Sequence, residues 1–359
     1  MKTIRELRRL TPGELLRVRR TLLRRFRRLD PGNVLEIGFG VARRDGRDDP
    51  SRDQAVSVIV RDKRRPRTGA ARIPATVRIR LRRGAGFVVA ELATDVVSRQ
   101  WEDWVPTRRP VRHLSGRQTA AATALVAWDD SQGPAWGLLT VGHAFAHVRH
   151  VPESAARVRV LVPGDGRDHG ERELGGRLLA RSRSRDRHRV DAALVLVKQE
   201  HLVVAGWAER AEESLPSPHG SPGVSPRTTA DLARDLGRPG QAITPTGDPP
   251  FVVRRYFPEF RLIPQVGPIR DVLEVESSTP GAFAPGGSGS AWTIGGEPAC
   301  LQFAGWMHPT DPAQSYRRGL GQPVVNVIDW GRAEIAASRA ADPSSPVSLS
   351  SPLRLVRLV

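Results

Sequence analysis

The chain has 359 residues and a formal net charge of +18, a length typical of two or three domains. Hydrophobic residues make up 39% of it, while 30 prolines and 34 glycines favour turns and short strands over long helices. Its single cysteine, Cys300, excludes an internal disulfide and suits a reducing compartment.

The basic excess is almost entirely arginine, which supplies 53 of the 56 basic residues. It is compatible with a solvated surface, which we favour, and with a patch that binds nucleic acid. The N-terminus lacks the uninterrupted apolar core of a secretory signal, and no run approaches the roughly 18 apolar residues of a membrane span. The sequence therefore predicts a cytoplasmic protein without membrane contact.

The first expected element is a helix that begins after Thr11. This residue is a candidate cap, Pro12 suits the first turn, and Glu14 completes a capping box. Leucines then recur at helical spacing as far as Leu29, with arginines between them. We expect the leucines to pack on a domain; a helix that binds a membrane surface or nucleic acid is the alternative.

Four strands are expected next, separated by turn-rich pieces, at 34–46, 55–63, 75–81 and 86–96. Gly38 and Gly40 do not have the spacing of a dinucleotide-binding fingerprint, and no suitable βαβ unit follows them. We expect these two glycines to mark a bulge or a close approach of strands.

From about residue 114 the pattern is one of many short strands, which predicts sandwiches or barrels. The stretch 209–229 is rich in proline, serine and glycine and reads as a linker between two sets of strands. Helical character returns near 324–340, and a spacer-like tail follows.

Three residues with complementary chemistry stand in order at the ends of apolar strands. His143 ends one strand, Asp191 begins another 48 residues later, and Ser288 lies in a glycine-rich bend a further 97 residues on. A serine hydroxyl is a weak nucleophile that needs an adjacent base. His143 can act as that base, and a carboxylate on its other ring nitrogen fixes the tautomer and stabilises the imidazolium.

The glycines around Ser288 suggest a further role for the backbone. A bend at "APGGSGSAW" that brings together the N–H groups of Gly286 and Ser288 would form an oxyanion hole. An α/β-hydrolase would instead run in the order serine, acid, histidine and would prefer glycine where this chain has Ser290. The order histidine, acid, serine in this chain therefore favours Ser288 as the nucleophile of a fold other than the α/β-hydrolase.

The motifs "TVGHAF", "DAALVLV" and "PGGSGSAW" resemble the His, Asp and Ser motifs of trypsin-like serine peptidases over about 114–337. The resemblance implies a mostly β chain with two six-stranded antiparallel barrels. The preceding strands resemble the small α/β domain, here with an N-terminal helix, of some bacterial intracellular relatives. The expected divisions are 1–113 for that domain, 114–208 and 230–337 for the barrels, 209–229 for the linker and 338–359 for a flexible tail.

The resemblance also implies substrate contacts. In "LQFAGW", the backbone around Gly305 and Trp306 would pair with bound peptide, and Ala282 would floor the specificity pocket, which favours a small or apolar residue there. Two positions depart from the family. Gly287 replaces the aspartate that many members pair with a freed N-terminus, so that activation switch cannot operate, and Ala144 replaces a cysteine.

The sequence thus predicts a serine endopeptidase that acts on protein or peptide without a cofactor or a metal, with a possible regulatory partner at the N-terminal domain. Two alternatives remain: a catalytically silent module of the same fold, and a basic protein that associates with nucleic acid. His143, His147 and His150 could form part of a zinc site, but the segment lacks the glutamate of the zinc-peptidase motif.

Overall fold

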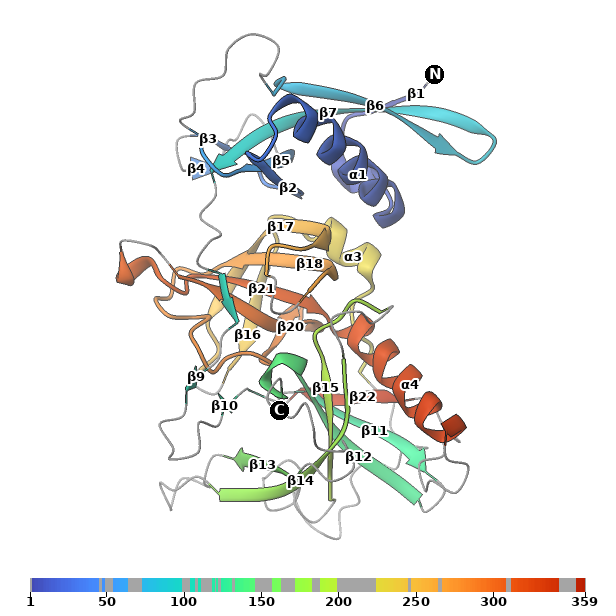
Figure 1. Cartoon of the computed structure of the whole chain (residues 1–359), viewed down its shortest axis with the longest axis vertical. Helices are drawn as coiled ribbons and strands as arrows, with labels where there is room; N and C mark the ends of the chain where they lie inside the picture. The colour runs from blue at the N-terminus through green and yellow to red at the C-terminus, as the bar shows by residue number, and fades with distance from the viewer. Residues whose placement is uncertain are drawn as a thin grey trace.

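The computed structural model places three tiers along the long axis of the molecule: an N-terminal module, a closed β-barrel and a six-stranded sheet (Figure 1). The structure describes residues 2–44, 47–48, 54–63, 73–98, 104–106, 109–110, 118–119, 121, 124–130, 133–145, 157–162, 172–182, 188–198, 224–244, 247–263, 267–307, 311–341 and 353–358. Most of the predicted linker 209–229 lies outside these residues.

The N-terminal module consists of one long helix and a small mixed sheet. Its elements are α1 (Pro12–Leu29), β1 (Lys2–Ile4), β2 (Val34–Gly40), β5 (Ala55–Val60), β6 (Thr76–Arg83) and β7 (Gly86–Ser98). All four strands expected before residue 98 are present. The predicted capping box is also present: Thr11 accepts a hydrogen bond from the Glu14 amide at 3.2 Å, and the Glu14 carboxylate accepts one from the Thr11 amide at 2.9 Å.

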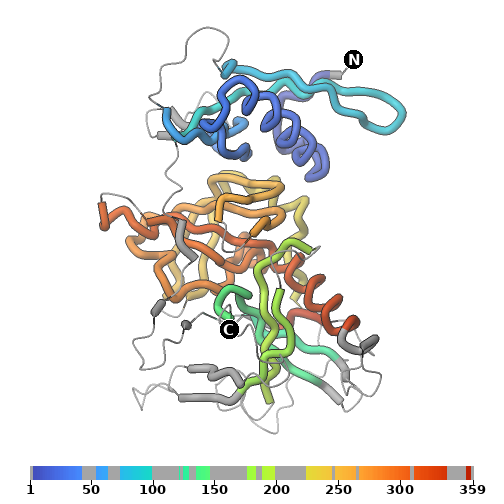
Figure 2. Tube along the Cα trace, viewed as in Figure 1, coloured from blue at the N-terminus to red at the C-terminus, as the bar shows by residue number. Residues whose placement is uncertain are grey.

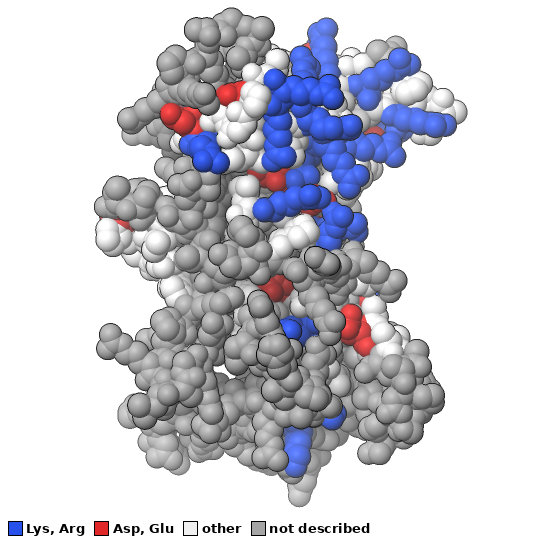
Figure 3. Space-filling view, in the orientation of Figure 1, with Lys and Arg blue, Asp and Glu red and all other residues white. Residues whose placement is uncertain are grey.

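The two faces of α1 differ in character. Its apolar face packs into the core through Leu15, Val18, Leu22 and Phe26, as expected of a helix that docks on a domain. Its other face exposes a row of basic side chains, which Figure 3 shows as part of a basic surface on this module. The exposed arginines of the helix are Arg17, Arg20, Arg24, Arg25, Arg27 and Arg28.

The second tier is a closed antiparallel barrel. Its strands are β16 (Pro239–Ile243), β17 (Pro250–Phe260), β18 (Ile269–Glu276), β19 (Ala291–Ile294), β20 (Glu297–Trp306) and β21 (Arg318–Pro323). They pair in the order β17-β16-β19-β20-β21-β18, and β18 closes the ring on β17. This barrel confirms half of the predicted pair of six-stranded barrels.

The strand β17 joins the barrel to the N-terminal module, because it also pairs with β2. A β-carbon at Gly38 would lie 2.6 Å from the Phe257 ring, and one at Gly40 would lie 2.5 Å from the Arg254 carbonyl oxygen. The two glycines therefore serve the close approach of strands that the sequence suggested.

The third tier is a sheet of six antiparallel strands. These are β11 (Ala124–Asp130), β12 (Gly133–Thr140), β13 (Arg157–Val162), β14 (Arg172–Arg181), β15 (Ala193–Val197) and β22 (Arg354–Leu358). Within the described residues β13 and β22 form its two edges, so it is a sheet rather than the closed barrel expected for 114–208. The edge strand β22 falls in the segment predicted to be a flexible tail, and it pairs with β11.

The C-terminal helix and the termini complete this arrangement. The helix α4 (Val324–Ala341) confirms the helical character expected there and packs its Val327 and Trp330 into the same core as the sheet. Figure 2 shows the N-terminus at the end of the molecule formed by the N-terminal module and the C-terminus in the lower half. Among the described helices, none has the length and apolarity required to cross a membrane.

The remaining elements are short. They are η1 (Leu7–Arg9), β3 (Arg43–Arg44), β4 (Arg47–Asp48), β8 (Trp104–Pro106), β9 (Arg109–Pro110), β10 (Gln118–Thr119), η3 (Gly142–Phe145), α3 (Thr229–Arg234) and η5 (Pro312–Gln314). Two of them, η3 and β8, lie at the candidate site.

Candidate active site

His143 lies on η3, the single turn that follows β12, and is 5% exposed. Its backbone N–H donates to Asp191 Oδ1 at 2.8 Å, and its ring Nδ1 is hydrogen-bonded to Asp191 Oδ2. A β-carbon at Gly142 would lie 2.8 Å from the Ala192 carbonyl oxygen, so a glycine allows this close contact. The sequence predicted this His–Asp pair, and the structure brings the two side chains together.

The backbone of Asp191 is held from the closed barrel. The Asp191 N–H donates to Gln322 Oε1 at 2.8 Å, and Gln322 Nε2 donates to the Asp191 carbonyl. Gln322 lies on β21 and is fully buried. Sequence reasoning missed this residue, because a single glutamine in a strand carries no periodic or motif signal. Through this amide clamp the barrel holds the backbone of Asp191, the residue that carries the carboxylate.

A second contact fixes the segment just before Asp191. Arg189 has a φ of 50°, in the left-handed region that residues other than glycine rarely adopt. Its guanidinium forms an ion pair with Glu259. Glu259 lies on β17 and also pairs with Arg261 and, at 3.5 Å, with Arg19 of α1. This cluster, centred on the buried Glu259, connects the helix of the N-terminal module to the Asp191 segment.

Electrostatics of this cluster favour the ionised carboxylate. Burial raises the pKa of Glu259, but the hydrogen bond from Arg261 and the charges of Arg19 and Arg189 outweigh it, so the pKa lies below its ordinary value. The folded state is therefore stabilised at pH values above the unfolded pKa of about 4.3, and this contribution is lost as the pH falls through the folded pKa.

We expect Glu259→Gln to lower the free energy of unfolding at pH 7 by about 3 kcal/mol, because it leaves Arg189 without its buried counter-charge. The variant should lose less stability than wild type between pH 7 and about pH 2.5, a range that extends below the lowered pKa of Glu259, and urea denaturation at the two pH values would measure this difference. As a control, Arg261→Gln removes a partner whose side chain is 57% exposed and should cost about 0.5 kcal/mol. Equal losses in the two variants would contradict this prediction.

Ser288 lies in the loop that joins β18 to β19, and its glycines have the conformations that the bend requires. Gly286 has a φ of 99° and Gly289 a φ of 94°. The Gly289 N–H donates to the Gln302 carbonyl at 2.7 Å, and the Ser288 carbonyl accepts from the Ala121 N–H at 2.6 Å. The loop is thus held between the closed barrel and the segment that leads into the sheet.

A tight turn precedes the serine. The Gly287 N–H donates to the Ala284 carbonyl at 3.1 Å. With Pro285 and Gly286 at its central positions and a positive φ at the second, it has the features of a type II turn. Among the described residues the Gly286 N–H donates to no acceptor. It is a fixed backbone donor, half-buried, two residues before Ser288.

The serine and the histidine are not hydrogen-bonded to each other. The Ser288 hydroxyl donates to the Phe303 carbonyl at 3.4 Å, outside the 2.5–3.0 Å typical of O–H···O bonds. His143 Nε2 is buried and, in the part of the chain that the structure describes, has no hydrogen-bond partner. The loops that carry the two residues nevertheless touch, because a β-carbon at Gly289 would lie 2.5 Å from Thr140 Oγ1, three residues before His143.

The predicted substrate contacts lie in different surroundings. Ala282 is half-buried and packs on the barrel core beside the fully buried Phe283. Gly305 and Trp306 end β20, and this end of the strand already has a partner: β8 pairs with it antiparallel, with Gly305 opposite Val105. The chain's own residues therefore occupy the backbone edge expected to bind peptide.

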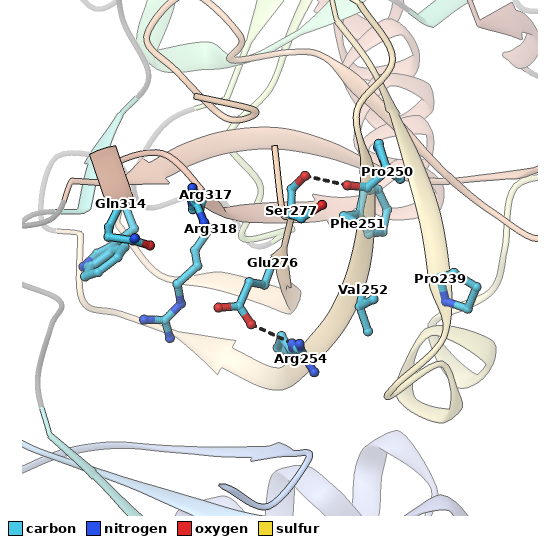
Figure 4. Close-up of a pocket in the computed structure, with 12 residues that line it drawn as sticks. Pro239, Pro250, Phe251, Val252, Arg254, Glu276, Ser277, Gln314, Arg317 and Arg318 are labelled. Atoms are coloured by element: carbon cyan, nitrogen blue, oxygen red, sulfur yellow. Dashed lines mark hydrogen bonds and ion pairs between the residues drawn. The ribbon is translucent and has the colours of Figure 1, made fainter. Parts of the chain in front are cut away.

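A pocket of about 460 Å³ lies on the barrel beside Trp306 (Figure 4). An ion pair between Arg254 and Glu276 crosses it at 2.7 Å, and the Ser277 hydroxyl donates to the Pro250 carbonyl at 2.6 Å. Ser288, His143 and Ala282 are not among its lining residues. It is therefore separate from the groups expected to carry the chemistry.

The histidine spacing in the sequence suggested part of a zinc site. Among the described residues, no three His, Cys, Asp or Glu side chains are grouped so that they could hold a metal ion. His147 and His150, the other two members of the proposed spacing, lie outside the described residues.

Comparison with solved structures gives distant likenesses, two of which are described here. No protein-family model and no curated protein matches the chain. The apo protease domain of MamO from Magnetospirillum magneticum is 12% identical, with a TM-score of 0.33 over 58% of this chain and 96% of that one. Kallikrein-related peptidase 10 is 14% identical, with a TM-score of 0.33 over 59% of this chain and 95% of that one. At these TM-scores neither likeness carries an argument about activity.

Proposed function

We propose that the chain is a serine endopeptidase of the trypsin-like type, with Ser288 as nucleophile and His143 as its base. The observation that carries this proposal is the His143–Asp191 pair. Asp191 holds Nδ1 and the backbone N–H of His143, which leaves the buried Nε2 as the nitrogen that can accept a proton. A histidine held in this way is oriented for general base catalysis.

The reaction would follow from these positions. Ser288 Oγ bonds to the peptide carbonyl carbon as its proton passes to His143 Nε2, and Asp191 stabilises the resulting imidazolium. His143 then returns that proton to the departing amine as the C–N bond breaks. Water then bonds to the acyl carbonyl carbon as His143 takes its proton, and that proton returns to Ser288 Oγ as the ester bond breaks and the carboxylic acid leaves. The N–H groups of Gly286 and Ser288 are the proposed donors to the oxyanion, where each such donor is worth about 10²-fold or more in kcat.

The resting orientation of Ser288 must change before this can occur. Its hydroxyl would rotate from the Phe303 carbonyl toward His143 Nε2. The hydrogen bond to the Phe303 carbonyl is 3.4 Å long, beyond the usual range, so breaking it costs little.

The same orientation favours a second candidate, a catalytically silent module in which Ser288 never meets the base. A fluorophosphonate probe separates the two. In the peptidase, Ser288 Oγ bonds to phosphorus as fluoride leaves, and Ser288→Ala abolishes labelling. Ser290→Ala is the matched control, because Ser290 is also buried in this loop but is not the proposed nucleophile. A folded wild-type protein that takes up no probe would support the silent module.

A further inference from the structure

The strand β8 lies along the C-terminal end of β20, next to the position where Ser288 contacts that strand. Along this edge β19 pairs with β20 as far as Leu301, and Ser290 and Gly289 continue the backbone hydrogen bonding at Gln302 before the chain turns into the Ser288 loop. The pairing with β8 begins at Ala304. Between these two pairings lies Phe303, whose carbonyl accepts the hydrogen bond from the Ser288 hydroxyl. The two strands thus occupy one edge of β20, with the proposed nucleophile at the gap between them.

The direction of β8 matches that of a substrate. It runs antiparallel to β20, with Trp104 opposite Trp306 and Pro106 opposite Ala304. Its C-terminal end is therefore the end closest to Ser288, about one residue's rise, or roughly 3.3 Å, from the position opposite Phe303. A peptide that paired with this edge and presented its next carbonyl to Ser288 would have to run in the same direction.

We propose that Trp104–Pro106 is a built-in pseudosubstrate strand that keeps the proposed peptidase latent. This inference rests on the proposed function, since it assigns a regulatory occupant to the same site. The far side of the β20 end is already paired with β21, where Gly305 lies opposite Gly319. Only one edge therefore remains for added backbone, and β8 occupies it.

Competition follows from the hydrogen bonding of a strand edge. An extended peptide that joins a sheet gains its affinity from main-chain hydrogen bonds, and each N–H and C=O of the edge can pair with only one strand. Because β8 belongs to the same chain, it competes at an effective concentration in the millimolar range typical of short tethers. An external peptide must displace it before its carbonyl reaches Ser288.

The position of β8 in the chain shows what could release it. It follows β7, the last strand of the N-terminal module, and precedes β11, the first strand of the sheet. In Figure 1 it is the short teal strand against the orange strands of the barrel. A partner or a cleavage that draws this connection away from the barrel would open the edge without rearranging the His143–Asp191 pair.

Two covalent probes test this proposal separately from the proposed function. A small ethoxy fluorophosphonate needs only Ser288, its base and the oxyanion donors. A tetrapeptidyl diphenyl phosphonate must also pair with β20; on reaction, Ser288 Oγ bonds to phosphorus and phenoxide leaves. The test variant carries Trp104→Gly, Val105→Ser and Pro106→Gly together, and the control carries Arg109→Gly and Pro110→Gly in β9, which pairs with β10 instead.

We expect the test variant to react with the peptidyl phosphonate at least tenfold faster than wild type, while its rate with the fluorophosphonate stays within twofold. The control should match wild type with both probes. Val105→Pro alone, which removes one backbone N–H from β8, should give a smaller increase of the same kind.

Equal peptidyl rates in wild type and in the test variant, with the fluorophosphonate reacting in both, would overturn the pseudosubstrate strand and leave the peptidase intact. If neither probe labels Ser288 in either protein, the proposed function fails and the regulation fails with it. The fluorophosphonate rate also reports on folding, since a variant with a disrupted site would lose it.

Discussion

Asp191→Asn is expected to lower the labelling rate and the kcat of the proposed peptidase by about four orders of magnitude while leaving the fold intact. Asparagine can still accept the His143 backbone N–H, which Asp191 Oδ1 now binds at 2.8 Å. Its amide cannot both keep the proton on Nδ1 and stabilise the imidazolium, so Nε2 would no longer serve as the base. The rate constant of fluorophosphonate labelling at pH 7, compared between the variant and wild type, measures the loss of reactivity.

Two further variants complete this prediction. His143→Gln should cost about as much, and the double variant should be little worse than either single one, because residues that act as a unit are strongly non-additive. Unfolding midpoints within a few degrees of wild type would show that the fold persists. Labelling of Asp191→Asn within tenfold of wild type would contradict the assigned role of the His143–Asp191 pair.

Gly289→Ala is expected to have the largest effect on stability among single substitutions in the serine loop. A β-carbon there would lie 1.9 Å from the Ala121 carbonyl oxygen, and the φ of 94° is one that alanine rarely adopts. Backbone strain and overpacking of this kind each cost about 1–3 kcal/mol. We expect a loss of at least about 3 kcal/mol in the free energy of unfolding, and loss of labelling as the loop moves away from Ala121.

The matched control for this substitution is Gly281→Ala. Gly281 has a φ of 70° in the same connection between β18 and β19, but a β-carbon there would meet nothing within 4 Å. It should therefore cost only the left-handed backbone strain of about 1 kcal/mol and leave labelling unchanged. The free energies of unfolding of the two variants, measured by urea denaturation, separate the cost of the steric contact from the cost of the backbone strain. Similar losses of stability in both variants would show that the contact with Ala121 is unimportant.

Local patterns in the sequence were sufficient for much of the fold. The helix beginning at Thr11 followed from its capping box, and the strands before residue 98 followed from apolar runs between turns. The bend around Ser288 was anticipated from its glycines, and two of them, Gly286 and Gly289, have positive φ values in the structure. These features depend on residues a few positions apart, whose steric and hydrogen-bonding preferences act whatever the rest of the chain does.

The His–Asp pair was also within reach of the sequence, because each residue adjoins a buried strand and the chemistry requires both types. The amide clamp of Gln322 on Asp191 was not, since it joins residues 131 positions apart. The same holds for Arg189 and Glu259, which are 70 positions apart and lie in segments with no shared pattern. No local preference encodes which side chain of a distant strand will face a given backbone.

The sequence by itself determined the N-terminal helix, the strands before residue 98, the chemical types at the candidate site and the bend that carries Ser288. Only the tertiary structure decided that one barrel closes, that the predicted tail supplies the edge strand β22, and that Ser288 points at Phe303. It also decided that β8 pairs with the edge where peptide was expected. The physical reason is that strand pairing uses backbone groups that every residue carries, so which strands pair is set by packing of the whole chain and not by local sequence.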